Sequence, residues 1–204
     1  QIMSAPSVLV VAPSLPANDL KELIALAKSK PGTLSFASSG AGGSPHLAGE
    51  LLKFRAGIDI IHIPYKGAAP ALADVVAGNV SMGFKTALSA IPHMQSGRLK
   101  PIAVAANKRL AQIPAVPTMA EAGLPDFEVS SWNGLLVPAR TAPEIIARLN
   151  RELVRILGTP DVREKFAAQA AEPVGSTPEQ FRAYIKAEID KWANVVKVSG
   201  ARVD

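Results

Sequence analysis

The alternation of short apolar runs with segments of helical periodicity constrains the fold of this chain more than any other feature. Segments whose apolar residues fall on one helical face lie between runs that are typical of strands, and glycine or proline ends most of them. The runs that predict strands are Val8–Ala12, Thr33–Ala37, Asp59–Ile63, Val80–Phe84 and Pro101–Ala106. Repeated strand–helix units favour a parallel sheet with helices on both faces. We therefore expect an α/β fold with a mostly parallel, five-stranded sheet.

The pattern changes after this region. An extended run, Phe127–Pro138, leads into a part with helical periodicity and no clear strand pattern of its own. The helices expected there are Pro143–Leu157, Asp161–Ala168 and a long one opened by Thr177-Pro178-Glu179. Their wide apolar faces require a packing partner.

The charge and the composition of the chain exclude several kinds of binding partner and site. The 204 residues carry a net charge of +5, and the excess is spread along the chain instead of being gathered in a basic tail or block. Aromatic residues make up only 5%, too few for a base-stacking surface, so nucleic-acid binding is not expected. The absence of cysteine excludes disulfides, thiolate metal sites and cysteine nucleophiles. No apolar run approaches the roughly 20 residues that span a bilayer.

A glycine-rich loop follows the second predicted strand. The segment Gly40-Ala41-Gly42-Gly43-Ser44-Pro45 combines sharp turns, uncovered amide N–H groups and a good helix start. Because free N–H groups and the helix dipole both attract negative charge, the loop predicts an anion site. Three interpretations are open: a small anion, most simply a carboxylate; a nucleotide; and a tight connection without a ligand. We favour the carboxylate, since His46 replaces the third glycine of a dinucleotide fingerprint and no Gly-Lys-Ser/Thr end is present.

Other polar residues follow strands at the same expected edge of the sheet, where open α/β sheets bind ligands. Tyr65 and Lys66 end the third predicted strand, and Lys85 and Thr86 follow the fourth. Each lysine either faces an anion or is an ordinary solvated turn residue. Trp132, in the extended run, either walls a cleft or packs in the core.

The histidines argue against a metal site. His46, His62 and His93 match no zinc-motif spacing and have no adjacent Glu, so we expect capping or packing roles and neither a metal nor another cofactor. Ser38 and Ser39 end a predicted strand without the Gly-x-Ser-x-Gly elbow of a hydrolase. A small α/β enzyme that uses the loop for a nucleotide or an acyl phosphate is the alternative, with His46 as its one obvious acid or base.

Several segments, in order along the chain, resemble one family. They are Pro31–Gly40, His62–Gly67, Ser96–Val104, Pro114–Gly123, Trp132–Leu135 with Pro138, and Glu172–Gly175 through Trp192. Together they cover essentially the whole chain, and their common order makes the match specific. On these segments the chain resembles the substrate-binding proteins of tripartite tricarboxylate transporters, the TctC or Bug family.

The resemblance implies a periplasmic solute receptor, not an enzyme, with the type II fold of periplasmic binding proteins, in which two α/β lobes close on a small carboxylate. The receptor would deliver that ligand to the membrane components of a tripartite tricarboxylate-type transporter. In the family the loop after Phe36 offers donors to a ligand carboxylate. The residues carried over are Ser38, Ser39, Gly40, Gly42, Gly43 and Ser44, to which we add Tyr65, Lys66, Thr86 and Trp132.

Two departures from the family pattern affect these expectations. The amino-terminal part of the first lobe has no counterpart, so residues 1–131 resemble the second lobe and residues 132–204 the segment that completes the first. Many members have Asp where this chain has Lys85, which would change the ligand charge that the cleft tolerates. A folded fragment without binding activity is therefore a third hypothesis. The exposed apolar faces of the carboxyl-terminal helices also favour a homodimer, with exchange of these helices as one route.

Overall fold

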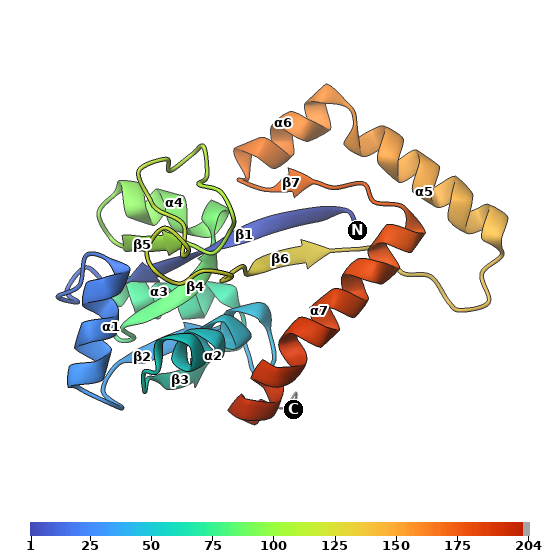
Figure 1. The fold of residues 1–204 in the computed structure, drawn as a ribbon. Coiled ribbons are helices and arrows are strands. Elements are labelled where there is room, and N and C mark those ends of the chain that lie inside the picture. Colours follow the sequence, from blue (N-terminus) through green and yellow to red (C-terminus); the bar gives the residue numbers. More distant parts are fainter. Residues whose placement is uncertain (202–204) are drawn as a thin grey trace.

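The computed structural model describes residues 1–201 and places the expected strands in one sheet (Figure 1). Its main path runs in the order β3-β2-β4-β1-β5. The strands are β1 (Met3–Val11), β2 (Ser35–Ser38), β3 (Ile61–Pro64), β4 (Met82–Thr86) and β5 (Lys100–Val104). β2 pairs parallel with β3 and β4, whereas β1 pairs antiparallel with β4 and β5. The predicted α/β fold is confirmed: the five predicted strands form the main path, four of them point in one direction and β1 runs opposite, and two further strands that pair with β1 make the sheet seven-stranded.

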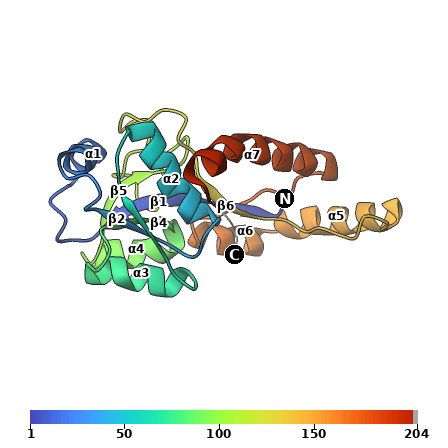
Figure 2. The ribbon, with the colours of Figure 1, turned by 90° about the horizontal axis from the view of Figure 1, so that it is seen from below.

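Helices cover both faces of this sheet (Figure 2). They are α1 (Leu20–Ser29) and α2 (Ser44–Ala56) on one face, and α3 (Ala68–Ala77) and α4 (Ala87–Gln95) on the other. Along β1, Leu9 and Val11 belong to the core under α1 and α2. Val8 and Val10 belong to the core under α3 and α4. A strand that is buried on both faces therefore appears in the sequence as an unbroken apolar run.

β1 is longer than predicted and joins a second group of strands. Its first half pairs antiparallel with β6 (Ser130–Asn133) and β7 (Glu172–Pro173). The sequence predicted this strand only from Val8, because Met3–Ser7 contains a proline and small residues with weak strand preference. Pairing with two strands from distant parts of the chain supplies what local preference lacks.

The expected carboxyl-terminal helices are present and form an arm beside the sheet (Figure 1). They are α5 (Pro143–Leu157), α6 (Pro160–Ala168) and α7 (Pro178–Ser199). α7 starts with a capping box between Thr177 and Gln180 and runs back to pack against α2. Trp192 and Val195 of α7 pack in the core shared with α1 and α2. This end of α7 therefore anchors the arm to the sheet.

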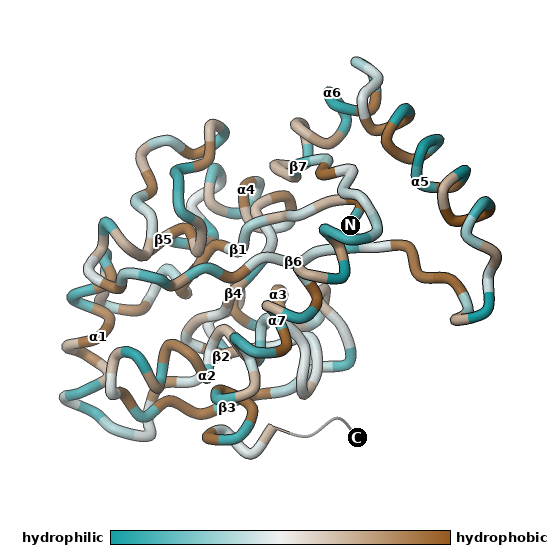
Figure 3. The backbone as a smooth tube through the Cα atoms, turned by 45° about the vertical axis from the view of Figure 1, so that its right-hand side comes forward, coloured by the Kyte–Doolittle hydropathy of each residue, from teal (hydrophilic) through white to brown (hydrophobic). Residues whose placement is uncertain are grey.

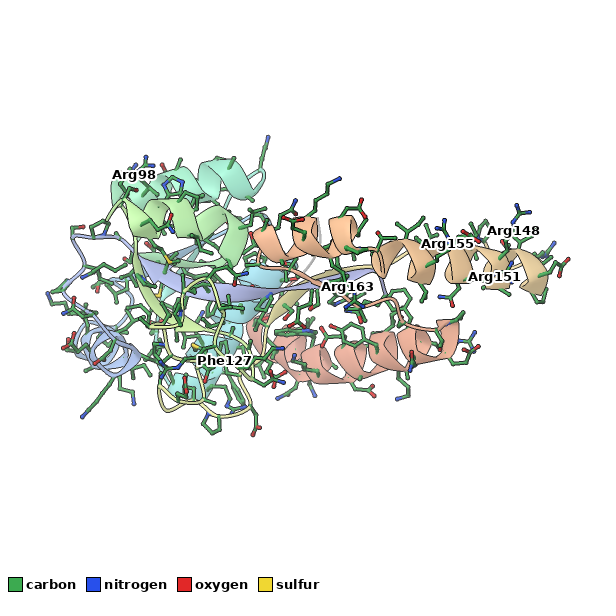
Figure 4. All side chains as sticks on the ribbon, turned by 90° about the horizontal axis from the view of Figure 1, so that it is seen from above. Arg98, Phe127, Arg148, Arg151, Arg155 and Arg163 are labelled. Atoms are coloured by element: carbon green, nitrogen blue, oxygen red, sulfur yellow. The ribbon has the colours of Figure 1, made fainter. Side chains whose placement is uncertain are left out.

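Hydrophobic residues recur along α5 (Figure 3), and its apolar face is only partly covered, with Leu149 39% and Val154 42% exposed. Ile146, Leu149 and Leu153 line a groove of about 300 Å³, together with Phe181 and Ile185 of α7. The other side of the helix carries exposed arginines, Arg148, Arg151 and Arg155 (Figure 4). Among residues 1–201, every helix is too short or too polar to cross a membrane.

One lysine is buried in the sheet without a counter-charge. Lys85 of β4 is 6% exposed, and no residue within 1–201 forms an ion pair with it. Its side chain lies over Gly83, where an added Cβ would come within 3.0 Å of the Lys85 Cε. Burial lowers the pKa of the Lys85 ammonium to about 8. The protonated lysine is therefore less stable in the fold than in the unfolded chain.

We expect Lys85→Met to stabilise the protein at pH 7. Because the folded-state pKa lies below the ordinary value of 10.5, the unfolded chain binds the proton more readily, and wild-type stability rises between about pH 8 and about pH 10.5. Below pH 8 the burial cost is on the order of 3 kcal/mol, which is the upper limit of the gain. Urea unfolding at pH 7 and pH 9.5 should show the larger advantage of the variant at pH 7.

Lys66→Met is the matched control for this comparison, because Lys66 is exposed. It should change the free energy of unfolding by less than about 0.5 kcal/mol at either pH. A Lys85→Met protein that is no more stable than wild type at pH 7, or equally advantaged at both pH values, would contradict the burial argument.

Candidate functional site

The Gly40–Ser44 loop connects the end of β2 to the start of α2. Gly40 and Gly42 have φ values of 139° and 75°, a region that favours glycine. Gly43 is the N-cap of α2, with φ −74° and ψ 163°, and Pro45 follows within the first turn. The glycines thus turn the chain from the sheet edge directly into the helix, as predicted.

The loop presents amide donors without protein acceptors. Within residues 1–201, the N–H groups of Ala41, Gly43 and Ser44 donate to no carbonyl and no side chain. They lie at the amino end of a 13-residue helix, where the dipole adds positive potential. This arrangement suits a negatively charged group such as a carboxylate.

Ser38 and two histidines support the loop from inside the protein. Ser38 is fully buried, and its Oγ donates to the Gly40 carbonyl over 3.0 Å and lies 2.6 Å from His62 Nε2. His46 Nδ1 accepts the Gly42 N–H over 3.0 Å. The two imidazoles stack with centroids 3.8 Å apart and planes 9° from parallel. His46 and His62 therefore have the capping and packing roles that were expected of them.

Burial keeps both imidazoles neutral. Burial, together with the smaller effects of the neighbouring His46 and Lys53 charges, lowers the pKa of His62 to about 4. Burial also lowers the pKa of His46, against the opposing effect of Glu50, whose Oε1 is 3.8 Å from His46 Nε2. At pH 7 the loop therefore rests on uncharged rings.

The turn after β3 lies against the loop. The Tyr65 N–H donates to the Ser38 carbonyl over 3.0 Å. The Tyr65 hydroxyl donates to the Asp74 carboxylate over 2.5 Å, which raises the pKa of Tyr65 to about 12. This phenol is therefore held by an internal partner. Lys66 is exposed in the same turn.

The remaining predicted residues lie in two places. Ser39 begins the loop, and Thr86 is the N-cap of α4 at the end of β4, the strand beside β2. Because β2, β3 and β4 are parallel, these residues share one edge of the sheet with Tyr65 and Lys66. Trp132 lies apart from them on β6, where its ring packs edge-on against α7. The contacts of each residue with a ligand stay a prediction.

The sequence analysis did not identify two supporting contacts. Asp74, which holds Tyr65, lies nine residues further along the chain on α3, and no motif signals the pair. The stacking of His46 on His62 depends on the register of β2 with β3, which pairs Phe36 with His62. The sequence offers one signal for the bond between the Gly42 N–H and the His46 ring: His46 follows Gly42 by four residues, across the start of a helix.

The chain matches a known receptor family along its described length. The family model for the tripartite tricarboxylate transporter family receptor, TctC, matches residues 1–201. Protein BugT of Bordetella pertussis is 42% identical over 198 residues, which are 97% of this chain and 61% of BugT. A UPF0065 protein from the tcbD-tcbE intergenic region of Pseudomonas sp. strain P51 is 38% identical, over 94% of this chain and 57% of its own. This chain thus spans about three-fifths of the length of these relatives.

Solved structures share the fold. Rpa4515 of R. palustris with adipate has a TM-score of 0.90 and 34% identity, over 100% of this chain and 68% of its own. MatC (Rpa3494) from Rhodopseudomonas palustris with bound malate has a TM-score of 0.84 and 32% identity, over 95% of this chain and 67% of its own. With the family match over residues 1–201, these similarities establish that the chain belongs to the tripartite tricarboxylate transporter receptor family.

Proposed function

We propose that this chain binds a small carboxylate at the Gly40–Ser44 loop, as part of a periplasmic solute receptor that delivers its ligand to a tripartite tricarboxylate-type transporter. The observation that carries the proposal is the set of unpaired amides of Ala41, Gly43 and Ser44 at the amino end of α2. Similar proteins have been solved with adipate and with malate, which are both dicarboxylates. The loop would hold one carboxylate by these amides, and Lys66 would add positive charge nearby.

The loop forms one side of the proposed site. We expect residues 1–131 to form one lobe and residues 132–204 to contribute to another, with the second ligand carboxylate held from the opposite lobe. A carboxylate held by this loop alone should bind more weakly than one held from both lobes.

Catalysis by this loop is the less favoured alternative. An enzyme would need a free acid or base beside the bound group. His46 already accepts the Gly42 N–H, and His62 already pairs with Ser38. The family is one of receptors, which agrees with a binding role.

Thermal unfolding with adipate, malate, citrate and ATP tests the proposal. A carboxylate should raise the melting temperature by about 3–5 °C once its concentration is about ten times Kd. Gly43→Asp should abolish this shift, because an Asp at the N-cap accepts from the first-turn amides and repels an anion, while the folded protein keeps or gains stability.

Gly43→Ala is the matched control for the aspartate. An added Cβ at Gly43 meets no atom nearer than 3.7 Å, so this variant should fold and retain the carboxylate shift. A shift with ATP alone would favour the nucleotide alternative. An equal carboxylate shift in Gly43→Asp and wild type would place the site elsewhere and refute the proposal.

We also propose that the chain forms a homodimer through the groove between α5 and α7. Large apolar side chains that line this groove are exposed, such as Leu136 at 74%, Leu149 at 39% and Val154 at 42%. An apolar face of this kind is usually covered by a partner, and a second copy presents the same face.

Multi-angle light scattering over a wide concentration range tests the dimer. We expect a dimer mass for wild type and a monomer mass for Leu149→Arg, which puts a charge in the groove. Arg148→Ala, on the outer face of the same helix, should remain dimeric. A wild-type monomer at every concentration would contradict the proposal.

A further inference from the structure

The Gly42 amide and the His46 ring form a bond that requires a neutral imidazole. The Gly42 N–H donates to His46 Nδ1 over 3.0 Å, so this nitrogen carries a lone pair and the proton lies on Nε2. His46 is the third residue of α2, after the N-cap Gly43, which has no side chain to cap the helix. The His46 imidazole accepts the N–H of Gly42, the residue before the N-cap. In a capping box, the side chain of the third helical residue accepts the N–H of the N-cap itself in a similar way.

The same ring is part of a packed stack beneath the loop. His46 stacks on His62, and His62 stacks on Phe36 of β2 at 4.9 Å. His62 Nε2 is bonded to Ser38 Oγ, which in turn donates to the Gly40 carbonyl. Two chains of contacts, one through each imidazole, therefore fix the two ends of the glycine turn.

The charged groups around the stack do not supply a second acceptor for a proton at Nδ1. Glu50 and Lys53 of α2 face it, with Glu50 3.8 Å from His46 Nε2 and 3.3 Å from the Lys53 ammonium. From α7, the side chains that share a hollow with these two residues are Val195, Val198 and Ser199, which carry no charge. On β2 and β4 the groups on this face are Phe36, Met82 and Phe84.

Protonation of His46 would turn its acceptor into a donor. Nδ1–H would then face the Gly42 N–H, and two donors cannot share that position. Glu50, 3.8 Å from Nε2, already pairs with Lys53 and lies on the other side of the ring, so it cannot replace the acceptor that the Gly42 N–H loses. The glycine turn would have to move, and the N–H groups of Ala41, Gly43 and Ser44 would move with it.

We propose that the stacked His46–His62 pair is a pH-sensitive clasp, which holds the Gly40–Ser44 loop in its binding form while both rings are neutral and releases it when His46 is protonated. His46 is then a positioning residue for the loop, not a ligand contact. The consequence for carboxylate affinity rests on the proposed function: affinity should fall in acid by more than protonation of the ligand explains. Since burial holds the pKa of His46 below its ordinary value of 6.5, release belongs on the acid side of that value.

A pH titration of the ligand-free protein tests the clasp. Two-dimensional 1H–15N NMR would follow the Gly42 amide, and imidazole resonances would follow His46, from pH 7.5 to pH 4.5. We expect the Gly42 amide to shift with the same midpoint as the His46 ring. In His46→Asn the amide oxygen can still accept the Gly42 N–H but does not titrate, so the Gly42 resonance should stay constant. His93→Asn, on α4, is the matched control and should titrate like wild type.

The second test measures the affinity for adipate by calorimetry at pH 7 and at pH 5. Protonation of adipate weakens its binding to every variant alike, so the comparison between variants removes that effect. Wild-type affinity should fall at least about fivefold further than the affinity of His46→Asn, as expected for the loss of one hydrogen bond and an ordered loop.

A Gly42 amide that does not follow His46, or equal pH dependence in wild type and His46→Asn, would overturn the clasp. If His46→Asn fails to fold, the wild-type titration decides alone. Failure of adipate to bind at pH 7, with Gly42 still following His46, would count against the proposed function and support the clasp.

Discussion

The structure depends on one strand that belongs to two groups of strands. The second half of β1 is buried on both faces between β4 and β5, and its first half pairs with β6 and β7 from the carboxyl-terminal part. Because β1 is continuous, the arm cannot move freely relative to the sheet that carries the loop. The return of α7 onto α2 adds a second connection between them.

The geometry of the candidate site follows from close packing of α2 on this sheet. A Cβ on Gly49 would come within 2.1 Å of the Phe36 ring, so only glycine lets the helix lie this close to β2. The short distance brings His46 over His62, whose ring centroids lie 3.8 Å apart. The same packing that stabilises the fold therefore sets the direction of the amides at the amino end of α2.

Local sequence patterns predicted what depends on neighbouring residues. The strand–helix order, the glycine turn and the start of α7 at Thr177 could be predicted because periodicity, positive-φ glycines and a cap are local signals. The first half of β1 and the two-residue β7 could not, since their partners are far away in the chain. Nor could the burial of Lys85 near the end of the central strand β4, where a lysine that faces an anion and a solvated lysine were equally expected.

The central claim is that the amides at the start of α2 receive a carboxylate. The most direct measurement is a 1H–15N NMR titration of the protein at pH 7 with adipate. The amides of Ala41, Gly43 and Ser44 should shift most and saturate together, with smaller changes at Lys66. Saturable shifts confined to the groove between α5 and α7, or no saturable shift at the start of α2, would contradict the account.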